Sequence, residues 1–347
     1  MHRQKTIKNW LWYNPADGLS MDERRKRFER IKRSGIDVLI PQLYNSSAAQ
    51  YESRIVPVTS NWLEMNLPLA RQAGLQVHGW MWCMPCNIDP IVVEHPQWFA
   101  VNGNGQPAHE KPPYVPYYKF MCPNHEGVQE FVRNIAVELA QIDGLEGVHL
   151  DYIRFPDVIL ASTLQRSYQI QQDREYPDYD YCYCETCRSL FKKQSGIDPL
   201  ELKDPSANKG WLQFRYDSIT HLVNQILIPA VRQHDKLVSA AVFPNWRHVR
   251  QQWAKWQLDA VFPMLYHTFY DQDIRWIKNM TRTGLHYLPS GIPLYSGLMA
   301  GAFNSKEFKE VIKACLSAGA GGVSFFENRA MTDERLQTLA DFMGREL

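Results

Sequence analysis

Short apolar runs alternate with longer amphipathic segments along this chain of 347 residues. The short runs have the length and the β-branched and aromatic content of buried strands. We predict eight strands from them: Ile7–Tyr13, Ile36–Tyr44, Leu75–Cys83, Gly147–Phe155, Leu237–Phe243, Ala260–Tyr266, Pro293–Leu298 and Gly321–Phe326.

The longer segments have helical periodicity. After the first run, Ser20 and Glu23 have the spacing of a capping box, and Gly35 is a stop signal. Between Val128 and Ile142 apolar residues recur at intervals of three and four. Further helices are predicted at Trp211–Gln233, around Val249–Leu258, and at Asp273–Thr283, Ser305–Ala318 and Thr332–Phe342.

Alternating strands and helices predict parallel βαβ units, and at this length eight units favour one (β/α)8 TIM barrel over residues 1–347. A doubly wound open sheet is the alternative, but no Gly-x-Gly-x-x-Gly follows the first run. Pro41 and Pro263 fall inside predicted strands, where a missing N–H predicts a bulge or an early strand end. The loops Met84–Asn124 and Asp157–Gly210 are unusually long, which is typical of functional segments, and the second (157–210) is interpreted as an insertion after the fourth strand.

In such barrels the active site lies at the C-terminal ends of the strands. Polar and aromatic residues stand at seven of the eight predicted ends. Aromatic rings stack on the C–H faces of sugars while amides, imidazoles and guanidinium groups bind hydroxyls, so the joint pattern favours a carbohydrate, although any single aromatic residue is more often a packing residue. The predicted substrate-binding residues are Gln42, Tyr44, His78, Trp80, Trp82, His149, Arg154, Asn245, Trp246, Tyr266, His267 and Tyr295.

The fourth apolar run, GVHLDYIRFPD (residues 147–157), ends in charged residues. Strand alternation places His149 and Asp151 on one face and Tyr152 with the apolar residues on the other. Because the apolar face packs against helices, we expect Asp151 to point into the barrel mouth. It is either a structural acid paired with Arg154, or a nucleophile or acid/base whose ionisation Arg154 sets.

Glycoside hydrolysis normally requires a second carboxylate. Glu327, at the end of the eighth run, is the best placed, while Glu110 and Asp157 lie in the long loops over the mouth. Asp259 stands at the start of its strand, at the opposite rim, and is discounted. Asp151 and Glu327 are therefore the predicted catalytic residues.

The segment YCYCETC holds Cys182, Cys184 and Cys187 with the spacing of zinc ligands. A tetrahedral site needs a fourth cysteine. Disulfides are the alternative, but the total of seven cysteines is odd and Cys182 is poorly spaced to pair with Cys184. We predict one structural zinc without a catalytic role, with the fourth ligand sought in the order Cys122, Cys83, Cys86.

Composition excludes some partners. The formal net charge is +1 without a long basic run, which argues against nucleic acid or an anionic membrane as the main partner. No stretch of about 18 apolar residues predicts a membrane span. The start, MHRQKTIKNWLWY, lacks a leader pattern, so the protein is either cytoplasmic or an envelope or extracellular protein whose leader was removed. Nothing indicates a protein partner.

Several segments resemble one family. DGLEGVHLDYIRFP (Asp143–Pro156) resembles the fourth-strand signature of the glycosyl-hydrolase-like 10 family, bacterial barrel proteins related to peptidoglycan glycan-strand hydrolases. HPQWFAVNGNGQP (His95–Pro107) and LDAVFPMLYH (Leu258–His267) stand in the expected order. The resemblance implies a (β/α)8 glycosidase with Asp151 in the active-site position, commonly exported to the cell envelope.

CYCETC is similar to the cysteine cluster of zinc-containing microbial β-galactosidases that carry Cys-Tyr-Cys-x-x-Cys. In those enzymes the fourth cysteine comes from upstream in the chain, so the resemblance supports Cys122 as the fourth ligand here. Two features depart from related patterns. The fourth run lacks the Asn-Glu pair that those β-galactosidases use as catalytic acid, and Ile153 and Arg154 replace the terminal Glu of the chitinase-like motif.

The predicted function is glycoside hydrolysis of a polysaccharide or oligosaccharide. A non-catalytic carbohydrate-binding barrel is the main alternative. A hydrolase of another bond type, using Asp151 with His78 or His267, is the third.

Overall fold

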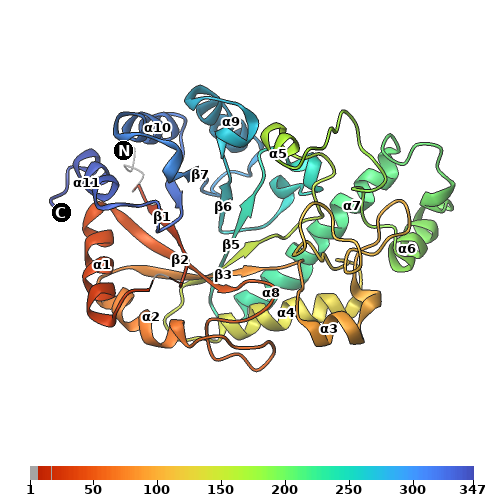
Figure 1. Ribbon diagram of the computed structural model, residues 1–347, viewed down its shortest axis with the longest axis horizontal. Coiled ribbons are helices and arrows are strands. Elements are labelled where there is room, and N and C mark those ends of the chain that lie inside the picture. The colour runs from red at the N-terminus through yellow and green to blue at the C-terminus, as the bar shows by residue number, and fades with distance from the viewer. Residues whose placement is uncertain (1–6, 17) are drawn as a thin grey trace.

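The computed structural model describes residues 7–16 and 18–347 as a barrel of eight strands surrounded by helices (Figure 1). All strand pairs are parallel, in the order β6-β5-β4-β3-β2-β1-β8-β7. The two end strands meet through isolated bridges that join Val261 to Leu294 and Met264 to Gly297. The predicted (β/α)8 fold is confirmed. Residues 1–6, the basic start of the chain, lie outside the described residues.

The elements have the following bounds. The strands are β1 (Asn9–Tyr13), β2 (Ile36–Tyr44), β3 (Gln76–Trp82), β4 (Gly147–Asp151), β5 (Leu237–Val242), β6 (Ala260–Pro263), β7 (Tyr295–Met299) and β8 (Gly322–Phe326). The helices are α1 (Met21–Ser34), α2 (Trp62–Gln72), α3 (Asp89–Glu94), α4 (Glu126–Ala140), α5 (Ser162–Ser167), α6 (Glu185–Ser195), α7 (Lys209–His221), α8 (Ile228–Arg232), α9 (Ile274–Tyr287), α10 (Ser305–Ser317) and α11 (Asp333–Met343). None of the described helices is long and apolar enough to cross a bilayer.

Capping residues and apolar periodicity in the sequence predicted the positions of several helices correctly. Ser20 and Glu23 form the predicted capping box of α1, and Gly35 ends that helix with a left-handed backbone. The predicted helix Trp211–Gln233 is present as α7, a π-helical stretch (Leu222–Leu227) and α8. Pro229 lies at the start of α8, and because proline has no N–H to donate, the hydrogen-bond register changes just before it.

The helix predicted around Val249–Leu258 is wrong. Two short 3₁₀ turns, Trp246–Val249 and Trp253–Lys255, stand there instead. Arg250 has a left-handed backbone, and the buried Gln251 side chain accepts a hydrogen bond from Phe243 N at 2.8 Å and donates to two strand-end carbonyls. These tertiary hydrogen bonds outweigh the helical periodicity. Among the described residues, no α-helix stands between β5 and β6 in the chain.

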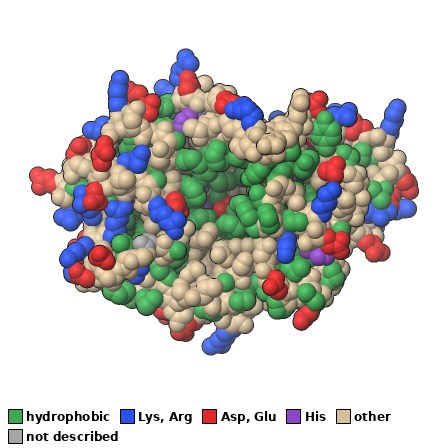
Figure 2. Space-filling model, in the orientation of Figure 1, with side chains coloured by type: hydrophobic (Ala, Val, Ile, Leu, Met, Phe, Trp, Pro, Cys, Tyr) green, Lys and Arg blue, Asp and Glu red, His purple; other side chains and the backbone are tan. Residues whose placement is uncertain are grey.

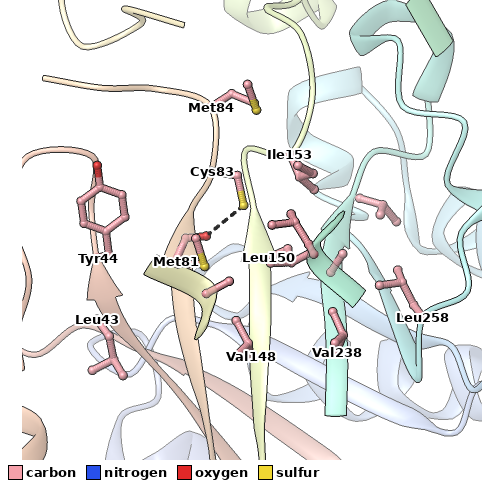
Figure 3. Packing of buried hydrophobic residues seen from close by; sticks show 14 of the residues in the cluster. Leu43, Tyr44, Met81, Cys83, Met84, Val148, Leu150, Ile153, Val238 and Leu258 are labelled. Carbon is pink, nitrogen blue, oxygen red and sulfur yellow. Dashed lines mark hydrogen bonds between the residues drawn. The ribbon is translucent and has the colours of Figure 1, made fainter. Parts of the chain in front are cut away.

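Alternation along the strands separates two apolar layers. Val148, Leu150 and Val238 face outward into the layer between barrel and helices (Figure 3). The barrel interior is filled by a smaller, largely aromatic cluster made of Trp10, Trp12, Val38, Ile40, Trp80, Ala241, Ala260, Phe262 and Tyr295. This cluster fills the interior of the barrel at mid-height.

Both proline predictions are confirmed. β6 ends at Pro263, and the β2–β3 pairing has an irregularity between Gln42 and Tyr44, just after Pro41.

Candidate active site

A cavity of about 360 Å³ opens at the C-terminal ends of the strands. Figure 2 shows hydrophobic side chains gathered around a hollow near the middle of one face of the molecule. Trp82, Asp151 and Phe326, the last residues of β3, β4 and β8, all line the cavity. The loops after β3 and β4 supply its outer wall, mostly with tyrosine and aliphatic side chains.

Asp151 is held at the floor of this cavity. Its Oδ2 accepts a hydrogen bond from Trp80 Nε1 at 3.0 Å, and its Oδ1 accepts one from the Tyr152 amide at 2.7 Å. Only 8% of Asp151 is exposed. Burial raises the pKa of Asp151 to about 6, against the opposing effect of those two donors and of the Arg154 charge. This carboxyl group therefore changes protonation close to neutral pH.

Tyr152 lies on the cavity side, so the prediction that it faces the helices is wrong. Its φ of 50° is left-handed, and β4 already ends at Asp151 rather than at Phe155. The turn breaks the alternation that holds along the strand. The Tyr152 ring packs 4.4 Å from that of Trp82 and lines the cavity beside it.

Arg154 pairs with Asp157 rather than with Asp151. Its Nη1 donates to Asp157 Oδ2 at 2.9 Å and to the Phe155 carbonyl, and both charged side chains are buried. The guanidinium also lies within 6 Å of the ring centres of Tyr118, Phe120, Tyr152 and Phe243. The charge of Arg154 lowers the pKa of Asp151, but burial, the largest influence, outweighs it.

Glu327 follows β8 and lines the same cavity as Asp151. Its side chain is 20% exposed, with Arg329 Nε 4.0 Å away. The buried Tyr266 lines the cavity together with both acids. Burial raises the pKa of its hydroxyl, and the charges of both Asp151 and Glu327 raise it further, so each carboxylate lies within electrostatic reach of one hydroxyl.

Half of the predicted binding residues line this cavity: Gln42, Trp80, Trp82, Arg154, Asn245 and Tyr266. The other six lie elsewhere.

Tyr44 faces the helical layer. The irregularity between Gln42 and Tyr44 pairs Gln42 with the inward Trp80 but Tyr44 with the outward Met81. Two residues that simple alternation places on one face therefore lie on opposite faces. Tyr44 is buried in the outer apolar layer (Figure 3).

Three predicted residues lie inside the barrel, below the cavity. Tyr295 begins β7 instead of ending it and packs against Trp10. His149 accepts a hydrogen bond from Trp12 Nε1 at 3.3 Å, and His78 packs edge-on against Trp10. Burial lowers the pKa of both histidines, that of His78 to about 3. They are neutral interior groups without a place in the cavity lining.

The last two lie outside the cavity. His267 stacks on Phe303 with ring centres 4.8 Å apart. Trp246 packs edge-on against Tyr216 and lines a separate groove. Of the loop acids, Asp157 lines the cavity beside Arg154, whereas the exposed Glu110 does not.

Sequence reasoning missed much of the cavity wall. Trp12 and Asn14 line the cavity at the end of β1, a strand end for which no site residue was predicted. The long loops were predicted to lie over the mouth, but the only carboxylates predicted from them were Glu110 and Asp157. The tyrosine-rich segment PPYVPYY in the loop after β3 was an available signal, since it supplies two wall residues. The missed residues outside the strands include Tyr117, Tyr118, Tyr152, Ile159, Leu160, Ala161, Leu164, Tyr168, Phe243, His248, Met264, Phe269 and Tyr270.

The insertion after β4 covers the cavity. Residues 159–168, including α5, line its outer side. Arg166 pairs with Asp271 at 2.7 Å, and Thr163 Oγ1 donates to the Phe269 carbonyl at 2.9 Å. These contacts connect α5 directly to the loop after β6, which also lines the cavity.

Four buried cysteines meet as predicted. The Sγ atoms of Cys122, Cys182, Cys184 and Cys187 all lie within 4.8 Å of one another. The separations from Cys122 are 3.4 Å to Cys187 and 3.5 Å to Cys184. A tetrahedral zinc with Zn–S bonds of about 2.3 Å requires sulfur separations of roughly 3.8 Å, so the set fits this metal. Cys83 and Cys86 stand apart from the cluster, and all seven cysteines are free thiols.

Further contacts support the cluster. Asn124 Nδ2 donates to Cys187 Sγ at 3.2 Å and the Val101 amide to Cys182 Sγ at 3.4 Å, as expected of groups that stabilise metal-bound thiolates. Nearby, buried Asp180 pairs with both Arg215 and Arg250. Cysteine cluster and ion pairs together fix the insertion to the loop after β3 and to the barrel.

No protein-family model matches the chain, and no curated protein matches it in sequence. Solved structures do. The glycoside hydrolase domain of PgaB (BpsB) from Bordetella bronchiseptica superposes with a TM-score of 0.74 at 12% identity, covering 97% of this chain and 99% of that one. The catalytic domain of β-amylase from Paenibacillus polymyxa gives 0.70 at 8% identity, with 99% of both chains covered.

A β-galactosidase from Halorubrum lacusprofundi gives a TM-score of 0.69 at 12% identity, covering 97% of this chain but only 58% of that one. At such identities these likenesses establish the fold.

Proposed function

We propose that the protein is a glycoside hydrolase that acts on a polysaccharide or oligosaccharide bound in the cavity above β4. The observation that carries the proposal is the environment of Asp151: a buried carboxyl group, held by Trp80 Nε1 and the Tyr152 amide, at the floor of an aromatic cavity. The fold shared with several glycosidases supports it.

Asp151 is proposed as the general acid that protonates the leaving oxygen. With a pKa of about 6, roughly a tenth of the Asp151 carboxyl groups are protonated at pH 7, far more than for an ordinary aspartate, and this protonated form is the one that a general acid requires. Glu327 is proposed as the second carboxylate, on the cavity rim, acting on the anomeric carbon or on a water molecule. Aromatic rings such as Trp82 and Tyr152 stack on the sugar and exclude water.

The cysteine cluster is proposed to hold one structural zinc. A site closed by four thiolates has no open position, so the metal supplies no chemistry to the reaction and fixes the insertion that covers the cavity. The likeness of DGLEGVHLDYIRFP to the glycosyl-hydrolase-like 10 signature leads us to propose a relationship with that group.

The other hydrolase hypothesis finds less support, because neither His78 nor His267 lines the cavity with Asp151.

The test is hydrolysis of a glycan panel that includes an α-glucan, a β-galactoside and an α-L-fucoside, classes suggested by the names of similar structures. On a substrate that the wild type cleaves, we expect Asp151→Asn to lower kcat by about 10²- to 10⁴-fold, the usual contribution of a general acid. Glu327→Gln should also lose most activity.

Asp143→Asn is the matched control, since this exposed acid lies before β4 and away from the cavity. It should keep full activity. An Asp151→Asn variant that is folded and as active as the control would refute the catalytic assignment. Binding of a glycan without any turnover by the wild type would favour the non-catalytic alternative.

A further inference from the structure

A second groove, with a volume of about 530 Å³, lies beside the connection between β5 and β6. Its walls are that connection and the last two turns of α9. The groove exists where a (β/α)8 barrel usually has a helix, because this connection forms only 3₁₀ turns. An absent helix leaves the flank of α9 uncovered.

Trp253 is a rigid wall of this groove. It is 3% exposed, and its Nε1 donates to the Phe243 carbonyl at 2.9 Å. Gly284 of α9 permits close packing, because a Cβ there would lie 3.4 Å from the Trp253 ring and 2.7 Å from Leu294 Cδ1. The shape of the groove is therefore fixed by packing.

The groove adjoins the candidate active site. Asn245 lines both the groove and the active-site cavity. Its chain neighbours Pro244 and Trp246 line the groove, while Phe243, two residues earlier, lines the cavity. A linear ligand that leaves the cavity over Asn245 enters the groove directly.

Two cations line the groove. The Arg247 guanidinium lies 4.8 Å above the Trp246 ring, which orients it, and Lys255 is exposed on the opposite turn. No Asp or Glu lines the groove, and neither cation has a carboxylate partner within 4.0 Å in the described part of the chain. Arginine binds carboxylates through a planar pair of donors, so an anionic partner suits this arrangement.

An aromatic surface completes the groove. Tyr287, the last residue of α9, lines it and is 56% exposed. An exposed ring beside unpaired cations suits a sugar that carries a negative charge, because the ring contacts the C–H face while the cations bind the acid. An uncharged apolar partner would leave both cations without a counter-charge.

We propose that this groove is a second binding site, which takes acidic sugar residues of a glycan chain extending from the active-site cavity. The proposal rests on the proposed glycosidase function for the identity of the ligand as a glycan. It adds that the glycan contains carboxylated units, recognised by Arg247 and Lys255.

The test is calorimetric binding of a galacturonic acid hexamer and of a neutral galactose hexamer to the full-length Asp151→Asn variant. We expect the acidic hexamer to bind at least tenfold more tightly, and its affinity to fall as salt rises. Adding Arg247→Gln with Lys255→Gln should lower the affinity for the acidic hexamer at least tenfold and leave the affinity for the neutral one unchanged. Adding Arg282→Gln with Lys313→Gln, two exposed cations outside the groove, is the control for net charge and should change neither affinity.

The inference would be overturned by equal affinity for the two hexamers. It would also be overturned if the Arg282 and Lys313 control lost as much affinity for the acidic hexamer as the Arg247 and Lys255 variant. The outcome is separable from that of the proposed function. Groove-dependent binding without turnover by the wild type supports the second site and counts only against catalysis. Turnover of glycans with no effect of Arg247 and Lys255 on binding counts only against the second site.

Discussion

Asp151 combines two opposing influences on one carboxyl group. Burial disfavours its charged form, while the Tyr152 amide, the Arg154 charge and Trp80 Nε1 favour it, and burial prevails. The result is an acid with a pKa of about 6 at the bottom of an aromatic cavity. Such a group can give up a proton near neutral pH and regain it from water, which is the property that acid catalysis needs.

The pH dependence of activity follows from that pKa. If Asp151 is the general acid, kcat/KM should fall about tenfold per pH unit above about pH 6, because only the protonated form can donate. Initial rates measured from pH 4 to 9 on a responsive glycan test this. Activity that instead rises through pH 6 would assign Asp151 the role of nucleophile or base.

Stability provides an independent readout of the same group. The folded pKa lies above the ordinary value of 3.8, so the folded state binds the proton more tightly than the unfolded state. The stabilisation of the folded state that comes from this raised pKa is therefore fully present below about pH 4 and is lost as the pH rises through about 6. We expect the free energy of unfolding of the wild type, measured with urea, to fall by up to about 3 kcal/mol between pH 4 and 7 relative to that of Asp151→Asn.

At the scale of elements, two long loops that are separate in sequence act as one unit. The cysteine cluster joins Cys122 of the first loop to Cys182, Cys184 and Cys187 of the second. The Tyr183 amide also donates to the Val101 carbonyl at 2.7 Å, alongside the bridge between Asn102 and Tyr181. The second loop then carries α5 over the cavity, so its position affects access to Asp151.

Metal content tests this connection. Protein purified without chelator should contain about one zinc per chain, and Cys187→Ser should lower the content to near zero and increase proteolytic cleavage within residues 157–180. Cys315→Ser is the control: it removes another buried thiol, on α10, outside the cluster, and should retain the metal. Metal-free wild type with an equally protected insertion would contradict the zinc proposal.

The connection between β5 and β6 shows that helical spacing in a sequence does not always produce a helix. The residues around Val249–Leu258 have helical spacing, but Gln251 and Trp253 are committed to hydrogen bonds with the backbone at the end of β5. The same competition gives the protein its second groove. A local pattern contains no information about such distant partners.

At the scale of the whole molecule, the barrel has one weak join. β6 and β7 meet only through isolated bridges, and Pro263 has no N–H to add to them. Every other neighbouring pair within the described residues forms a parallel ladder, although the β1–β2 and β2–β3 ladders each contain a register shift. We infer that local opening of the barrel begins between β6 and β7.

Native-state hydrogen exchange measures that opening. The amides of Val261 and Leu265 should exchange at least tenfold faster than those of Val148 and Leu150 in β4, because fewer interstrand hydrogen bonds must break to expose them. All four residues are fully buried, so differences in solvent exposure are controlled. Equal protection at the two places would refute a weak join.

The sequence by itself determined the fold class, the order of the eight strands, the capping box of α1 and three of the four clustered cysteines, because each depends on local periodicity or close spacing. It also placed Asp151 and Glu327 at one mouth, since parallel strands end at the same rim. Tertiary structure alone decided which neighbours these acids have. A left-handed turn at Tyr152 and an irregularity before Tyr44 each reversed a face, and Arg154 took Asp157 as its partner. These outcomes depend on contacts between distant segments, and a strand pattern cannot encode them.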